Sequence, residues 1–159
     1  TDGTITVSNQ NGGSGTYEYS YDGGSNWELG STKTDLSANS YSVQMRDANN
    51  HSDVIDLGTI DLYNPFSATV ASTNPTINGG TDGTITVTAQ GGKLPYEYSY
   101  DNGVNWSVVN SKSDCSQGSY AVKVKDANGS EQDLGTVTLA DPGALAANVS
   151  KTDPTIFNG

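Results

Sequence analysis

The sequence predicts an all-β protein made of tandem Ig-like antiparallel β-sandwich repeats of about 79 residues. Its apolar residues fall in short alternating runs separated by Gly, Asn, Asp and Ser, the pattern of strands and turns. Apolar spacing of three and four residues never persists for three turns, so no helix is expected. Most of the sequence recurs after about 79 residues, a size typical of serial β-sandwich domains.

The repeat consists of strand and turn motifs that return in the same order. The matching pairs are Thr1–Val7 with Thr81–Val87, Tyr17–Asp22 with Tyr96–Asp101, Trp27 with Trp106, Tyr41–Asn49 with Tyr120–Asn128, Asp56–Thr59 with Asp133–Thr136, and Asn74–Ile77 with Asp153–Ile156. The first two pairs are identical. From their phase we expect a further copy after Gly159, and any targeting segment outside these residues.

Two proline-containing stretches, Tyr63–Pro65 and Asp141–Gly143, have the composition of linkers. They divide the chain into a β-sandwich repeat lacking its first segment (1–64), a complete repeat (65–142) and the opening segment of a following repeat (143–159). A boundary at Gly80 would instead give two whole copies of the 1–80 type. We favour the division at the linkers.

In the second copy, the first three expected strands follow from alternation of apolar and polar residues. Ser67–Ser72 alternates Ala and Val with polar residues, and Thr84–Ala89 alternates Ile and Val with threonines. A Gly91-Gly92 turn then leads to Tyr96–Tyr100, where three tyrosines alternate with Glu and Ser. We expect those tyrosines and their counterparts Tyr17, Tyr19 and Tyr21 to pack in the core; the other interpretation is a glycan-stacking face.

The remaining expected strands are a returning strand at Asn105–Val109, then Ser119–Lys125 and Leu134–Leu139. The dipeptide Asn128-Gly129 predicts a hairpin turn between the last two, because both residue types tolerate positive φ. Gly135 is a candidate β-bulge within the final strand.

Charge and cysteine content narrow the function classes. A net charge of −11 with seven Lys plus Arg argues against nucleic-acid binding and against electrostatic attachment to anionic membranes. No apolar run is long enough to insert directly into a membrane. The single cysteine, Cys115, cannot form an intrachain disulfide. It aligns with Leu36, so we expect a small buried apolar residue rather than a nucleophile.

An Asp-box pattern, Ser-x-Asp-x-Gly-x-x-Trp, occurs once in each copy. Its residues are Ser20, Asp22, Gly24 and Trp27, and then Ser99, Asp101, Gly103 and Trp106. The carboxylate can accept backbone N–H groups across the turn while glycine adopts positive φ, so we expect a structural turn. Exposed Trp27 and Trp106 would instead favour glycan stacking.

Acidic hairpin tips are candidate weak Ca²⁺ sites. Their residues are Asp22, Asp47, Asn49, Asp101, Asp126 and Asn128. Neither a twelve-residue acidic calcium loop nor a nonapeptide calcium repeat is present, so we favour a structural role in turns and expect no resident cofactor. His51 is the only histidine and aligns with Ser130, so we expect no catalytic triad or zinc site in every copy. A carboxylate pair for glycoside hydrolysis is the remaining catalytic alternative. Because the acids fall almost wholly in turns, we expect no enzyme.

Three segments in order resemble the SprB-type repeat of gliding-motility adhesins: Asp82–Val87, Gly91–Ser99 and Tyr120–Gly129. The resemblance covers most of both copies. It implies a very large cell-surface protein of gliding bacteria, exported by the type IX pathway and gripping an external surface or polysaccharide. The alternative is a carbohydrate-binding array that uses exposed Tyr and Trp.

Neighbouring repeats of the same chain are the other expected partners. The opening segment at the C-terminus raises a further hypothesis, that it donates a strand to another molecule.

Overall fold

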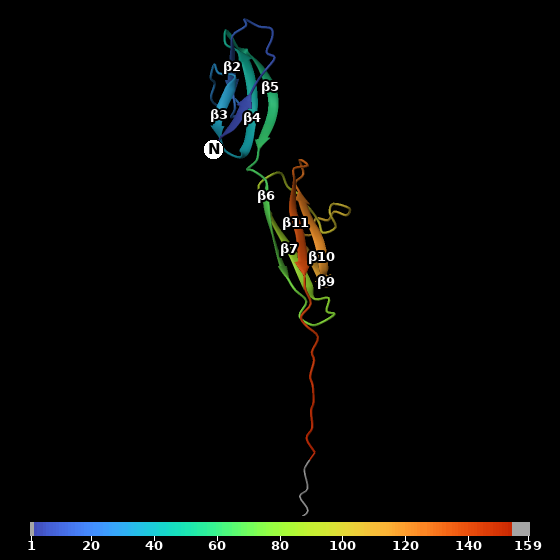
Figure 1. Cartoon of the computed structure of the whole chain (residues 1–159). Coiled ribbons are helices and arrows are strands. Elements are labelled where there is room, and N and C mark those ends of the chain that lie inside the picture. Colours follow the sequence, from blue (N-terminus) through green and yellow to red (C-terminus); the bar gives the residue numbers. More distant parts are fainter. Residues whose placement is uncertain (1, 154–159) are drawn as a thin grey trace, which may run out of the picture. The chain divides into compact units, whose positions relative to one another are not determined.

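The computed structural model describes residues 2–153, which form an all-β chain of antiparallel sheets with no helix (Figure 1). The strands are β1 (Gly3–Thr6), β2 (Tyr17–Ser20), β3 (Thr32–Leu36), β4 (Asn39–Asp47), β5 (Asn50–Leu62), β6 (Ser67–Thr73), β7 (Gly83–Gln90), β8 (Glu97–Ser99), β9 (Ser111–Cys115), β10 (Gly118–Lys125) and β11 (Glu131–Leu139). Accordingly, no helix in the described range is long and apolar enough to cross a membrane.

Backbone proximity divides the chain into two compact units. One unit contains Thr1–Ser67 together with Ala89–Tyr96 and Lys125–Glu131, and the other contains the rest. By sequence copy, the strands form two sets, β1–β5 in the first copy and β6–β11 in the second.

The first copy contains a three-stranded sheet, β2-β4-β5, and a two-stranded sheet, β1-β3. Strand β2 runs antiparallel to β4, with Tyr17 opposite Asp47 and Ser20 opposite Gln44. The β4–β5 ladder is the longest, and its register shifts beside Gly58, which has a φ of 86°. The shift marks a β-bulge, where glycine adopts positive φ without steric cost.

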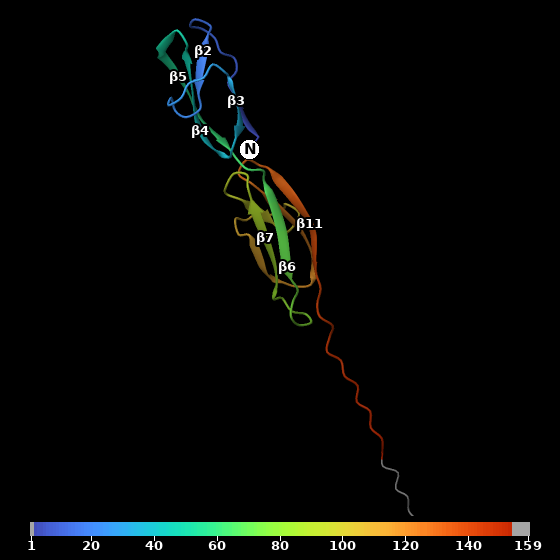
Figure 2. The same cartoon turned by 90° about the vertical axis from the view of Figure 1, so that its left-hand side faces the viewer.

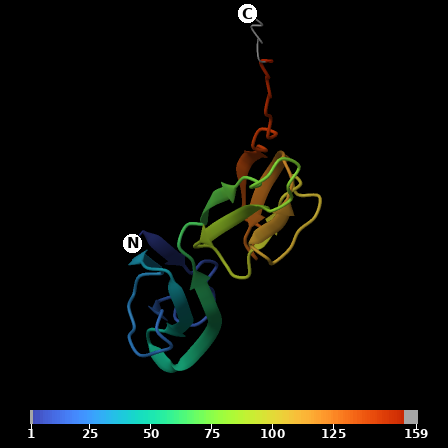
Figure 3. The same cartoon turned by 90° about the horizontal axis from the view of Figure 1, so that it is seen from below.

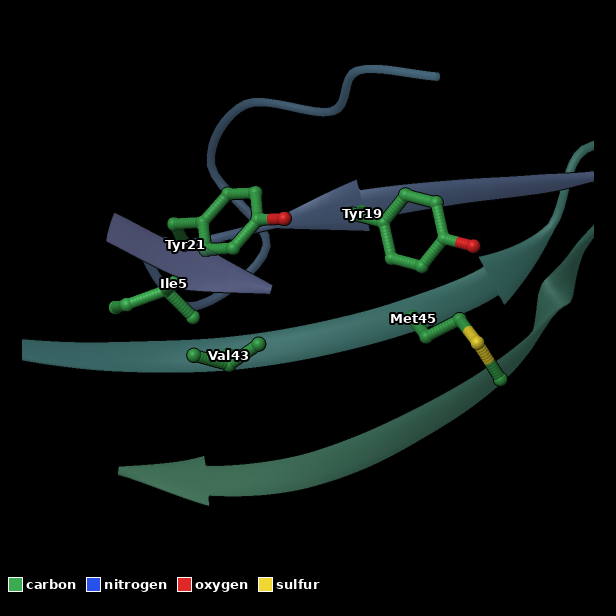
Figure 4. Packing of buried hydrophobic residues seen from close by; sticks show 5 residues of the cluster. All are labelled: Ile5, Tyr19, Tyr21, Val43 and Met45. Atoms are coloured by element: carbon green, nitrogen blue, oxygen red, sulfur yellow. The ribbon is translucent and has the colours of Figure 1, made fainter. Parts of the chain in front are cut away.

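Side chains from both sheets form the core of the first copy. Ile5 comes from β1, Tyr19 from β2, and Val43 and Met45 from β4, with Tyr21 following β2 (Figure 4). The alternation of residues along each strand directs these side chains to one face. Burying each large apolar side chain contributes about 1.5–3 kcal/mol to folding. Tyr19 and Tyr21 are thus core residues, as their alternation predicts.

The second copy contains two three-stranded sheets, β11-β10-β8 and β6-β7-β9, and β6 borders β7 (Figure 2). Its most deeply buried apolar residues are Ile85, Val87, Val122, Val124, Cys115 and Leu139. Cys115 is a free thiol within this core, in the position expected from its alignment with Leu36.

The prediction of a strand at Asn105–Val109 is wrong. Only an isolated bridge between Tyr98 and Ser107 forms there, and the pairing strand is β9, further along the chain. Strand β9 pairs with β7 from Gly83 opposite Cys115 to Thr86 opposite Ser111. Its sequence Ser-Lys-Ser-Asp-Cys buries only the cysteine, so it lacks the apolar alternation that identifies a strand.

Residues 140–153 follow β11 without joining any sheet (Figure 3).

Candidate functional site

The Asp-box of the first copy closes a tight turn after β2. Ser20 Oγ donates a hydrogen bond of 2.8 Å to Asp22 Oδ1, and Gly24 N donates one of 2.8 Å to Ser20 Oγ. Asn26 adds a backbone bond of 2.9 Å to the same carboxylate. Gly24 has a φ of 89°, which a side chain would disfavour.

The second Asp-box repeats this arrangement almost atom for atom. Ser99 Oγ donates to Asp101 Oδ1 at 2.8 Å, Gly103 N donates to Ser99 Oγ at 2.8 Å, and Asn105 N donates to Asp101 Oδ1 at 2.9 Å. Both serines are fully buried. The motif therefore forms a braced turn in each copy.

These hydrogen bonds favour the charged form of each carboxylate. They lower the pKa of Asp22 to about 2, chiefly through the side chain and backbone of Asn26. They lower the pKa of Asp101 to about 2 in the same way, led by the backbone N–H of Asn105. A carboxylate that accepts several N–H bonds is held ionised, so the two turns carry fixed negative charge at neutral pH.

Both tryptophans are half-buried over their own turns. Trp27 Nε1 donates a hydrogen bond of 3.0 Å to Gly24 O, and the Arg46 guanidinium carbon lies 4.1 Å from the ring centroid. Trp106 packs on Gly103, where an added Cβ would lie 3.4 Å from the ring. Packing over the hairpin is the arrangement expected for a structural tryptophan.

Asp47 and Asp126 form a second pair of braces that the sequence did not reveal. Asp47 is buried and accepts bonds from Ser14 Oγ (2.8 Å), Asn49 N (2.7 Å) and Asn50 N (3.1 Å). The Ser14 contact joins residues 33 positions apart, so the carboxylate fastens a distant loop to its hairpin. No local motif signals such a contact.

Asp126 has the same role in the second copy. It accepts bonds from Lys93 N (2.9 Å), Asn128 N (3.0 Å) and Ser130 N (2.8 Å). In each copy a glycine with positive φ lets the loop approach the aspartate. An added Cβ at Gly13 would clash with the Asp47 carboxylate, and one at Gly92 would clash with the Asp126 carboxylate. The bonds lower the pKa of Asp47 and Asp126, led respectively by the backbone of Ser14 and of Lys93.

The candidate calcium residues do not converge. Asp22 follows the C-terminal end of β2, whereas Asp47 lies opposite Tyr17 at the N-terminal end of the same strand. At 3.3 Å per residue, the two ends of β2 are about 10 Å or more apart. Asn49 and Asn128 contribute backbone N–H groups, to Asp47 and Asp126. Within residues 2–153, no three His, Cys, Asp or Glu side chains are grouped to hold a metal ion. Calcium binding stays a prediction.

An aromatic hollow lies beside each Asp-box. Tyr21, Trp27, Lys33 and Tyr41 line it in the first copy, and Tyr100, Trp106, Lys112 and Tyr120 line it in the second. Each residue of the second set lies 79 positions after its counterpart.

Two polar atoms at these hollows are buried without a hydrogen-bond partner, namely Glu28 Oε1 and the Tyr100 hydroxyl. Burial raises the pKa of Tyr100 to about 12, so its hydroxyl stays protonated. Aromatic walls with a few polar groups are the composition of sugar sites as well as of ordinary hairpin packing.

Residues 69–105 match the SprB repeat family, whose members are parts of cell-surface proteins. The matched range begins within β6 and ends at Asn105, one residue before Trp106 of the second Asp-box. No curated protein and no solved structure gives a significant match to the chain.

Proposed function

Because residues 69–105 match the SprB repeat family, we propose that the chain is a structural and adhesive part of a large secreted cell-surface adhesin filament. The filament would serve attachment to external surfaces or gliding motility, outside the cell, after export by the type IX pathway. The chain would have no enzymatic activity and no resident cofactor. Its partners would be neighbouring repeats and an external surface or polysaccharide, with no nucleic acid and no membrane insertion.

The duplicated bracing of the turns supports the structural part of this proposal. Four acidic side chains, Asp22, Asp47, Asp101 and Asp126, hold backbone N–H groups in equivalent turns of both copies. A group that stabilises a turn through several hydrogen bonds is engaged in the fold. Tandem units of this kind suit a filament that must keep its shape under load.

Net charge supports the same assignment. A net charge of −11 favours solubility when many copies crowd a cell surface. Arg46, the only arginine, pairs with Glu18 at 2.6 Å and covers Trp27, so it is occupied within its own copy.

A second candidate function is favoured by the two aromatic hollows. Equivalent positions in both copies would give many weak sugar sites along an array, and linked weak sites bind with avidity. In this alternative, Trp27 and Trp106 stack on sugar rings while Lys33 and Lys112 bind polar substituents.

Beads coated with the chain and held against flow test both candidates. The proposed function predicts that they adhere to glass or polysaccharide more strongly than beads coated with the heat-unfolded chain. Equal retention would contradict an adhesive role.

The double variant Trp27→Ala/Trp106→Ala separates the two candidate functions. Its control is Leu29→Ala/Val108→Ala, which changes exposed side chains that do not line the aromatic hollows. Selective loss in the tryptophan variant would support sugar stacking.

A further inference from the structure

The first copy has an open sheet edge where the second copy has a strand. In the second copy, β7 lies between β6 and β9, whereas β1 pairs only with β3 within residues 2–153. Strand β1 covers four residues and β7 covers eight, although Thr4–Val7 and Thr84–Val87 are identical in sequence. Strand β7 has β6 as an additional neighbour, whereas Asn9, in the stretch that follows β1, has a φ of 61°. An unpaired strand edge is a template for another strand.

The same difference leaves apolar surface uncovered. Ile85 and Val87 have no exposed surface, whereas Ile5 keeps 7% and Val7 is only half-buried. Leu57 and Ile60 are 40% and 42% exposed, but their counterparts Leu134 and Val137 are half-buried.

Ile5, Val7, Leu57 and Ile60 line a surface groove together with Thr4, Thr6 and Val43. A groove with apolar walls beside an open edge fits an extended segment that alternates apolar and polar residues.

One segment of the chain has that pattern and no partner strand. Ala146–Thr152 aligns with β6, and Ala147, Val149 and Thr152 are identical to Ala68, Val70 and Thr73. In β6, Ala68 and Val70 are half-buried, while the intervening Thr69 is exposed. In the C-terminal segment, Val149 is 98% exposed. The residues that would fill the groove are therefore free to do so.

We propose that Ala146–Thr152 of one molecule adds as an antiparallel strand to the β1 edge of a second copy of this chain. The register follows from β6. Thr73 Oγ1 lies 2.8 Å from Thr84 Oγ1, and Gln90 Nε2 lies 3.2 Å from Ser67 Oγ at the other end. By alignment, Thr152 lies beside Thr4 and Val149 opposite Val7.

This contact joins the C-terminal segment of each molecule to the first copy of the next. Such a head-to-tail contact does not close on itself, so association produces open chains. In a chain that continues before Thr1 with a segment like β6, that segment pairs with the same edge of β1 within one molecule. The inference does not depend on the adhesive role.

Light scattering across a concentration series tests the proposal on the full chain. The average mass rises with concentration in the wild type and stays monomeric in Ala147→Asp/Val149→Asp, which carries charges into the groove. The control Asn148→Asp/Ser150→Asp adds the same charge at positions that face away, and it associates like the wild type. A wild type that stays monomeric throughout, or equal association of both variants, overturns the proposal.

Disulfide trapping tests the register without relying on affinity. Thr4→Cys protein is mixed with Thr152→Cys protein under oxidised glutathione, and a covalent heterodimer is the expected product. Asn148→Cys in place of Thr152→Cys puts the thiol opposite the wrong end of β1 and gives at least tenfold less heterodimer. Equal yields from the two mixtures would show random encounter and contradict the strand register.

Discussion

Matched valines in the two copies give a quantitative test of how β6 completes a sheet. Val87→Ala removes two methyl groups from a site with no exposed surface, and Val7→Ala removes them from the half-buried equivalent. At about 0.8 kcal/mol per methyl-sized group, the transfer term at Val87 is about 1.6 kcal/mol. A residual cavity raises the total to about 2–3 kcal/mol.

At Val7 the removed groups already contact water, so about half the transfer term and little cavity cost are expected, or about 1 kcal/mol. The measurement is urea unfolding followed by tryptophan fluorescence in two single-tryptophan backgrounds. Trp27 reports the first copy and Trp106 the second, and dilute protein avoids association. Equal losses of unfolding free energy at the two valines would refute the claim that β6 seals one sheet and leaves the other open.

The other predictions concern the braced turns. The folded pKa of about 2 for Asp22 and Asp101 lies below the ordinary 3.8, so their stabilisation of the fold is complete above about pH 4 and lost as pH falls towards 2. Thermal melts of Asp22→Asn/Asp101→Asn should therefore show a smaller loss of stability across that pH window than melts of the wild type. An unchanged loss of stability would contradict the assignment. Gly12→Ala should lower the stability of the first copy by about 1 kcal/mol, because Gly12 has positive φ. Gly13→Ala should lower it by more, because Gly13 also has positive φ and in addition faces Asp47. Equal losses of unfolding free energy in urea would argue against the brace. Melting temperatures in EDTA and in millimolar Ca²⁺ should agree, since the carboxylates are engaged in turns; a large upward shift with Ca²⁺ would show that the hairpin tips bind ions.

The fold class and most strands could be predicted because each strand with a buried face alternates apolar and polar residues. The Asn128-Gly129 dipeptide is another local signal: a turn forms there, and Gly129, but not Asn128, has positive φ. Strand β9 could not be predicted, because Ser111–Asp114 are exposed and held by backbone pairing with β7. Its place depends on the neighbouring strand, which a local pattern does not contain.

The candidate site was predictable to a similar extent. Within the Asp-box, the serine, aspartate, glycine and tryptophan contact one another within a few residues, so the motif shows the turn. The Asp47 and Asp126 braces connect to Ser14 and Lys93 across 33 residues. A single sequence gives no signal for such a separation, and both aspartates looked like ordinary hairpin-tip residues.

The central claim, that this chain is an adhesive repeat displayed outside the cell, is tested most directly on intact cells that carry it. Fab fragments raised against the folded chain are applied to living cells, with a Fab against an unrelated cytoplasmic protein as control. The account predicts that the Fab labels unbroken cells and reduces their attachment or gliding at saturating dose. Labelling that appears only after lysis, or surface labelling with no effect on attachment or movement, would contradict it.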